Sequence, residues 1–114
     1  MLKLVHNNLS EKGKIIVKTI NCSNPILGLN SRYKDFTHET GFTEESLSQV
    51  LKIAGFKNVK IYPQDIYVFY TNPLNYLAKL LSKVLNCIFR LIFILYGRKT
   101  TRIFTKSIIA VAEK

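Results

Sequence analysis

The sequence predicts an α/β fold, and three observations support this class. Segments with helical periodicity alternate with short apolar segments typical of strands, in the order helix, strand, helix, strand, long helix, strand. A length of 114 residues allows one domain at most, with a small core. A hydrophobic fraction of 47% and a mean hydropathy of +0.10 exclude a disordered polymer.

The chain begins with a predicted helix and a predicted strand. Residues 1–10 carry a rough apolar face, and Gly13 suits the turn after a helix. This helix starts at the initiating Met without a cap, so we expect that a segment upstream is missing. The nearly continuous β-branched run KIIVKTI, at 14–20, predicts a strand covered on both faces. Ligands gather beyond the carboxyl ends of strands in open α/β sheets, so Asn21 and the long loop 22–42 are expected near a functional site.

A second helix and a second strand follow. Thr43 suits the N-cap of a helix over 43–54, with two glutamates in its first turn and apolar residues spaced for one buried face. Gly55 stands at the position of a C-terminal capping glycine. The alternation at 57–62 predicts a strand that Pro63 ends.

Residues 73–97 predict one long helix, with Pro73 in its first turn and Gly97 at its end. Its polar residues form a narrow stripe of Asn75, Lys79, Ser82, Lys83, Asn86 and Arg90. Three cations make it a poor transmembrane span. Two interpretations stay open: an interfacial helix on a membrane surface, or a helix packed on the sheet or on a partner subunit. A third strand is predicted over 105–112.

Charge points to an anionic partner. The chain has 17 Lys and Arg against 7 Asp and Glu, a net charge of +10. Between Ile66 and Ala112 there is no acidic residue, and this segment is also the most apolar. The combination favours an anionic membrane surface over nucleic acid, although a solvated basic face is the simpler explanation of composition alone.

Cys22 and Cys87 have neither a CxxC partner nor a His at metal spacing, so a zinc site is not expected. Both are interpreted as reduced and structural. The N-terminus lacks the apolar core of a signal peptide. We therefore expect a cytoplasmic location. Because the basic, apolar segment favours an anionic membrane surface, peripheral attachment to the inner face of the membrane is also expected.

Three segments together resemble class I S-adenosylmethionine-dependent methyltransferases. LSEKGKIIVKTIN resembles the turn and strand that end in an Asn in that family, and DFTHETGFTEESLSQVLKIAGFKNVKIY resembles the segment that follows. RIFTKSIIAVAEK resembles the last strand. The resemblance covers most of the chain outside 64–96, and the most similar members are bacterial enzymes associated with polysaccharide and lipopolysaccharide synthesis.

The resemblance implies the C-terminal half of a Rossmann-like methyltransferase fold. The three strands would be the fifth, sixth and seventh of the family's sheet, forming a three-stranded mixed sheet with flanking helices. The seventh strand would be antiparallel and would lie between the other two. Residues 1–114 would form a single partial methyltransferase domain, and 73–97 would be an inserted long amphipathic helix.

The chain also departs from the family. The family binds S-adenosylmethionine through a glycine-rich turn after its first strand and an acidic residue that ends its second. The five glycines here form no G-x-G, and no strand is predicted upstream of the one at 14–20 to carry such a turn. We therefore expect no cofactor binding by this chain alone, an exposed edge on the strand at 14–20, and a companion chain that carries the cofactor half.

The cluster RYKDFTHE would then belong to the acceptor-binding loop. By the resemblance, His38 is the candidate catalytic base for a hydroxyl acceptor, and Asp35 or Glu39 would orient its imidazole. Arg32 would hold a phosphate or carboxylate of the acceptor, with Asn21 and Tyr33 also at the substrate. The structural alternatives are that His38 and Glu39 stabilise the start of the next helix, and that Tyr33 packs the loop.

A different class of function also fits the sequence. In that alternative the chain is a non-enzymatic membrane-surface or scaffold protein, in which the basic amphipathic helix carries the function and the sheet supports it. A nucleic-acid-binding role ranks third, because the basic residues are not interleaved with exposed aromatic residues on one strand face.

Overall fold

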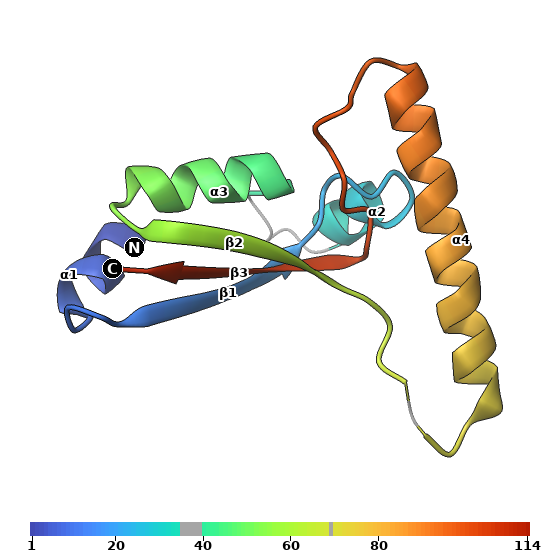
Figure 1. Cartoon of the computed structure of the whole chain (residues 1–114), viewed down its shortest axis with the longest axis horizontal. Coiled ribbons are helices and arrows are strands. Elements are labelled where there is room, and N and C mark those ends of the chain that lie inside the picture. The colour runs from blue at the N-terminus through green and yellow to red at the C-terminus, as the bar shows by residue number, and fades with distance from the viewer. Residues whose placement is uncertain (35–39, 69) are drawn as a thin grey trace.

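In the computed structural model, a small sheet and four helices are found in the described residues, which are 1–34, 40–68 and 70–114 (Figure 1). The alternating order predicted from the sequence is confirmed, with one helix added. The elements are α1 (Leu2–Asn8), β1 (Lys14–Ile20), α2 (Leu27–Tyr33), α3 (Glu44–Ile53), β2 (Lys57–Gln64), α4 (Pro73–Leu95) and β3 (Ser107–Glu113).

The three-stranded sheet has the order β1-β3-β2. The last strand therefore lies between the other two and runs antiparallel to both, as expected. Because both pairings are antiparallel, the expectation of a mixed sheet is wrong for this chain. The two outer strands share a direction, but the central strand separates them, so no parallel ladder forms between named strands.

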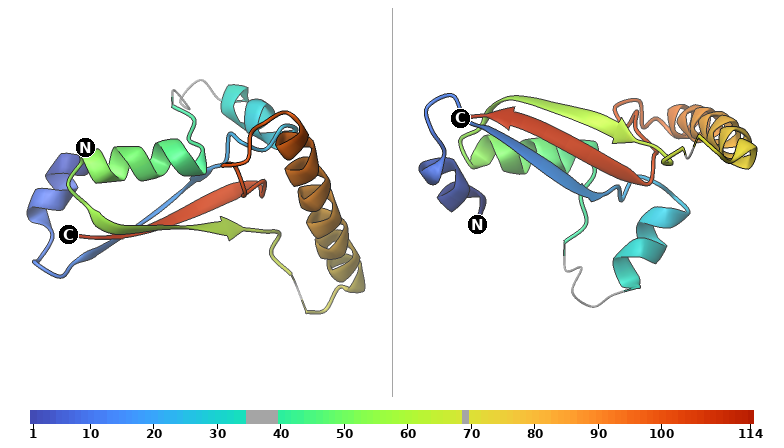
Figure 2. Two further views of the ribbon diagram at one scale, coloured as in Figure 1. Left: turned by 45° about the horizontal axis from the view of Figure 1, so that its top comes forward. Right: turned by 90° about the horizontal axis from the view of Figure 1, so that it is seen from below.

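The core lies between one face of the sheet and α3 (Figure 2). Burial alternates along β3, so that every second side chain faces the helix. The buried core side chains are Leu47, Leu51, Phe56, Ile108, Ala110 and Ala112. No described helix lies on the opposite face, where Ile16 is 72% exposed. The prediction that β1 is covered on both faces is therefore wrong, because its apolar run meets a helix on one side only.

The predicted ends of α3 are confirmed. Thr43 Oγ1 accepts a hydrogen bond from Ser46 N at 3.2 Å, and Ser46 Oγ accepts one from Thr43 N at 2.9 Å, which makes a capping box. At the other end Gly55 has φ +104° and Phe56 N donates to Leu51 O at 3.1 Å. This pattern is a Schellman motif, which requires the left-handed backbone that glycine adopts without strain.

Two boundaries differ from the sequence prediction. The segment 22–42 contains α2 instead of being loop throughout. The side chain of Asn24 starts this helix, because its Oδ1 accepts from Ile26 N at 3.0 Å and from Leu27 N at 2.7 Å. The strand β2 continues through Pro63, which pairs with Ile108. An edge strand tolerates proline, since its outward side needs no donor.

The long helix α4 lies across the end of the sheet instead of along one of its faces (Figure 1). Asn72 caps it, and Gly97, at φ +76°, ends it as predicted. Its half-buried residues recur at helical spacing and are Asn75, Ala78, Lys79, Ser82, Asn86, Phe89 and Phe93. The helix thus turns its polar stripe toward the rest of the chain. Across the described ranges, no helix is both long and apolar enough to cross a membrane.

Candidate functional site

The candidate site is the end of the sheet where β1 and β2 finish and β3 begins, with α2 and α4 beside it (Figure 1). Asn21 lies directly after β1 and is completely buried. Its Nδ2 donates to Ile103 O at 2.8 Å and to Thr105 O at 3.0 Å, while its Oδ1 accepts from Ser23 N at 3.0 Å. The side chain therefore holds the segment before β3 against the segment after β1.

Asn24 adds to the same attachment. Its Nδ2 donates to Phe104 O at 2.6 Å, so that two asparagines together bond three consecutive carbonyls, those of residues 103–105. We call this pair the asparagine clamp. Gly28 of α2 packs closely on the backbone of Asn21: a Cβ at position 28 would lie only 3.0 Å from the backbone oxygen of Asn21. The clamp thus fixes α2, β1 and the segment before β3 relative to one another.

A groove of about 400 Å³ lies between α4 and this end of the sheet. We call it the α4 groove. Its lining comes from four separate segments. The turn before α2 and its first residue give Asn24 and Leu27, and the segment after β2 gives Asp65 and Ile66. The helix α4 gives Ala78, Leu81, Ser82, Leu85 and Asn86, and the segment before β3 gives Phe104, Thr105 and Lys106. Phe104 is 1% exposed and joins the helix to the sheet, with its ring centroid 4.6 Å from that of Phe93 and 6.2 Å from that of Phe89.

The groove is largely apolar with a few convergent polar groups, which is typical of small-molecule sites. Asp65 Oδ1 accepts from Ser82 Oγ at 3.0 Å and from Ile66 N at 2.8 Å. The hydrogen bond to Ser82 therefore joins the segment directly after β2 to α4 at the wall of the groove. A second hollow of about 290 Å³ shares Phe104 and Asp65, and it adds the cations Lys83 and Arg102. The chemistry present suits an acceptor with an apolar part and an anionic or hydroxyl-bearing part.

The residues predicted from sequence are only partly brought together. Asn21 is at the expected place, but its amide is fully engaged in the clamp, so contact with a substrate would require those bonds to break. Arg32 and Tyr33 end α2, where the Arg32 guanidinium lies 5.5 Å from the centroid of the Tyr33 ring. Neither lines the α4 groove. Asp35, His38 and Glu39 lie outside the described residues, so their roles stay predictions.

Asp65 and Lys106 are groove residues that the sequence reasoning missed. Asp65 directly follows β2, and the rule that selected Asn21, namely a polar residue just beyond a strand's carboxyl end, would also have selected it. Lys106 precedes β3, and no comparable rule marks the residue before a strand. The α4 contribution to the groove could not be found from local sequence, because it depends on how the helix crosses the sheet.

The described glycines and carboxylates at this end of the sheet are engaged with neighbouring groups. No group of three or more His, Cys, Asp or Glu that could hold a metal occurs among the described residues. The two glycines near the end of β1 are used for close packing, since a Cβ on Gly28 would meet Asn21 and one on Gly41 would collide with the Cys22 sulfur. The nearby carboxylates are engaged as well: Asp65 with Ser82, and Glu44, whose Oε1 accepts from Arg102 N at 2.9 Å.

Comparisons with known proteins support the fold. No protein-family model matches the sequence, and no curated protein matches it either. Among solved structures, the chain is similar to a SAM dependent methyltransferase from Archaeoglobus fulgidus, with a TM-score of 0.58 and 18% sequence identity. The match covers 99% of this chain and 50% of that one, so the chain spans half the length of this structural relative. The chain therefore has a methyltransferase-like α/β fold.

Proposed function

We propose that the chain is the acceptor-side half of a class I S-adenosylmethionine-dependent methyltransferase domain. The observation that carries the proposal is the sheet topology. A last strand inserted antiparallel between two strands of common direction is what the sequence resemblance implies, and the likeness to a SAM dependent methyltransferase extends over 99% of the chain. The remaining strands of such a domain, with the cofactor side, would come from the same polypeptide or from a companion.

The outer edge of β1 is where those strands would attach. Along the described chain β1 pairs with β3 on one side and with no named strand on the other. Such an edge presents unpaired backbone donors and acceptors, and a long apolar edge favours pairing with another strand. The exposed Ile16 beside it would be covered by a helix of the added half.

The work of this half would be to bind and orient the acceptor. Proximity and alignment supply most of the rate enhancement in an in-line displacement. The α4 groove would hold the apolar part of the acceptor, and Lys83 and Arg102 would attract an anionic part. In this proposal His38 takes the acceptor proton, Asp35 or Glu39 orients it, and Arg32 and Tyr33 contact the acceptor, as the resemblance implies.

Hydrogen–deuterium exchange tests the assembly. The chain would be measured alone and with the protein encoded directly upstream of it. The proposal predicts slower exchange of the β1 amides, 14–20, in the mixture, because the outer edge gains hydrogen-bond partners. The amides of β3, at 107–113, serve as the internal control because they are already paired on both sides. Slower exchange confined to α4, with β1 unchanged, would contradict docking at this edge.

The two histidines give a matched test of the chemistry. In an assembled enzyme, His38→Ala should reduce formation of S-adenosylhomocysteine by about 10²–10⁴-fold, the usual contribution of a general base. His6→Ala is the control, since His6 packs edge-on against Phe56 at 5.0 Å in the core region. It should affect stability without a comparable loss of turnover per folded molecule. Equal turnover in both variants would exclude His38 as the base.

A further inference from the structure

We propose that α4 docks on an anionic membrane surface, with its apolar side in the lipid and its axis in the plane of the interface. This inference goes beyond the methyltransferase proposal and does not depend on it. It starts from the side of α4 that faces away from the sheet. The exposed apolar residues of α4 that line neither hollow are Leu74, Leu77, Leu80, Val84, Ile88, Leu91, Ile92, Ile94 and Leu95.

The direction of this apolar side is the first argument. A helix that packs on its own domain normally buries its apolar stripe and exposes its polar one. Here the half-buried stripe contains Asn75, Lys79, Ser82 and Asn86, while Val84 and Leu91 on the opposite side are 51% and 58% exposed. A continuous apolar surface of this extent marks an interaction site. The described part of the chain does not cover it.

Charge decides in favour of a lipid surface. Between Ile66 and Ala112 the chain carries no acidic residue but seven basic ones: Lys79, Lys83, Arg90, Arg98, Lys99, Arg102 and Lys106. In the described structure none of the seven side-chain cations forms an ion pair within 4.0 Å, and Arg102 meets Glu44 Oε1 only through its backbone N–H. Helical spacing places Lys83 and Arg90 along one border of the apolar side, and Lys83 also lines the second hollow. In the docked state their stems would lie on apolar surface and their charges would reach anionic headgroups.

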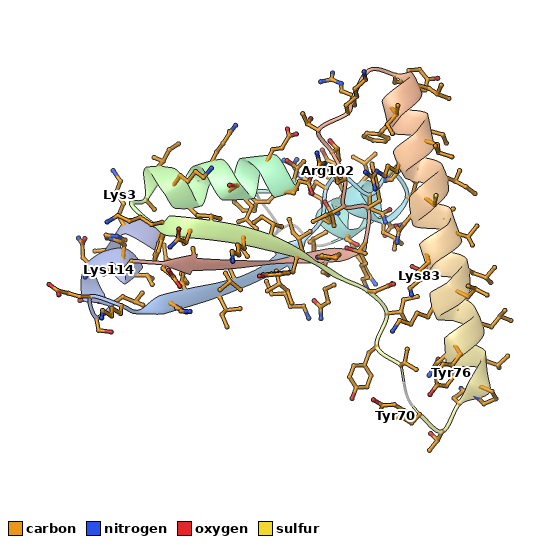
Figure 3. The ribbon with its side chains drawn as sticks, viewed as in Figure 1. Lys3, Tyr70, Tyr76, Lys83, Arg102 and Lys114 are labelled. Carbon is orange, nitrogen blue, oxygen red and sulfur yellow. The ribbon has the colours of Figure 1, made fainter. Side chains whose placement is uncertain are left out.

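Aromatic residues mark both ends of the same surface. Tyr70 and Tyr76 lie at the start of α4, and Tyr96 ends it; all three are exposed. Figure 3 shows Tyr76 and Lys83 along α4, Tyr70 just before it, and Arg102 where the chain returns toward β3. Tyrosine rings favour the headgroup level of a bilayer, because one end of the ring is apolar and the other is polar. A helix that is basic, apolar on one side and too polar to span is typical of interfacial binding.

The position of α4 gives the docking a consequence for the groove. The α4 groove lies on the inner side of this helix, so a docked α4 would hold the groove within a helix diameter, about 10 Å, of the lipid surface. An acceptor with a lipid anchor and an anionic headgroup could then enter the groove from the membrane. This substrate class rests on the proposed function, whereas the docking does not.

Vesicle flotation tests the docking with the complete chain. Neutral phosphatidylcholine vesicles would be compared with vesicles containing about 30% of the anionic lipid phosphatidylglycerol, which give the surface a negative potential. Binding should be strong only to the anionic vesicles and should weaken with salt. Lys83→Gln with Arg90→Gln should weaken it about 30-fold, at about fivefold for each cation. Lys52→Gln with Lys57→Gln, which removes the same charge from α3 and β2, should leave binding nearly unchanged.

The apolar contribution is tested separately. Val84→Glu or Leu91→Glu should weaken vesicle binding tenfold or more, on the order of the transfer free energy of one buried aliphatic side chain. Ile53→Glu is the control, because Ile53 is also an exposed apolar helix residue and lies on α3. Circular dichroism of each variant verifies that the fold is kept. Both substitutions on α4 lie on the outward side and line neither hollow.

A probe on Cys87 separates lipid from protein contact. Cys87 is exposed on α4, and a Cys22→Ser background leaves it as the single thiol. A nitrobenzoxadiazole label there should shift to shorter wavelength with anionic vesicles and be quenched by spin-labelled lipids. Equal binding to neutral and anionic vesicles would overturn the charge argument. No vesicle binding, combined with self-association that Leu91→Glu abolishes, would assign the surface to a second copy of the chain instead.

Discussion

Replacing Asn21 by alanine gives a direct measure of the asparagine clamp. The change removes hydrogen bonds to Ile103 O at 2.8 Å, to Thr105 O at 3.0 Å and from Ser23 N at 3.0 Å, at a completely buried position. Each bond contributes about 0.5–1.5 kcal/mol, so the free energy of unfolding should fall by about 2–4 kcal/mol. For a domain whose total stability is about 5–15 kcal/mol, this is a large fraction.

Urea unfolding followed by circular dichroism measures the loss. With a slope of about 1.5 kcal/mol per molar urea, the midpoint should fall by about 1.3–2.7 M. Asn21→Asp keeps the shape but replaces the donating amide by a carboxylate facing two carbonyl oxygens, so it should be at least as destabilising at neutral pH. Asn30→Ala, at an exposed position on α2, is the control and should change stability by less than about 0.5 kcal/mol. If Asn21→Ala matched this control, the clamp would have no net role in holding the end of the sheet.

Three further predictions concern other parts of the fold. Gly55→Ala should destabilise by about 1–2 kcal/mol in urea unfolding, because φ there is +104°. Phe104→Ala should cost about 3–5 kcal/mol and, since this ring joins α4 to the sheet, should make the segments flanking α4 sensitive to limited proteolysis. A hydrogen bond from Asn58 and the ion pair with Lys14 at 3.0 Å lower the pKa of Glu113 below its ordinary 4.5. That contribution to stability is present above the ordinary pKa and is lost as pH falls through the lowered, folded-state pKa. Glu113→Gln should therefore lower the Tm at pH 7, and this difference should disappear in acid once the pH lies below the lowered pKa.

The helices and strands were largely predictable from local signals. Thr43 and Gly55 mark the two ends of α3, as predicted from their side-chain and backbone chemistry, and short apolar segments located all three strands. The place of β3 in the middle of the sheet came from the family resemblance, because strand order depends on contacts between distant segments. The helix α2 was missed, since its start depends on the side chain of Asn24, which is also held by a carbonyl 80 residues away.

The candidate site was predicted less well, for a physical reason. Local sequence marks the end of a strand and placed Asn21 directly after β1, but it does not say whether a polar side chain will face a ligand or bond the backbone. The orientation of α4 shows the same limit. Its polar stripe predicts which residues share a face, whereas the side that meets the sheet depends on Phe89 and Phe93 packing on Phe104.

Calorimetric titration of S-adenosylmethionine tests the central claim most directly. The purified chain would be titrated alone and again after mixing with the protein encoded directly upstream. The proposal of an acceptor-side half predicts no measurable heat of binding for the chain alone and saturable binding for the mixture, because the sequence has no G-x-G turn and Gly28 and Gly41 pack against their neighbours. Saturable binding by these 114 residues alone would contradict it, since a cofactor site would then exist within them.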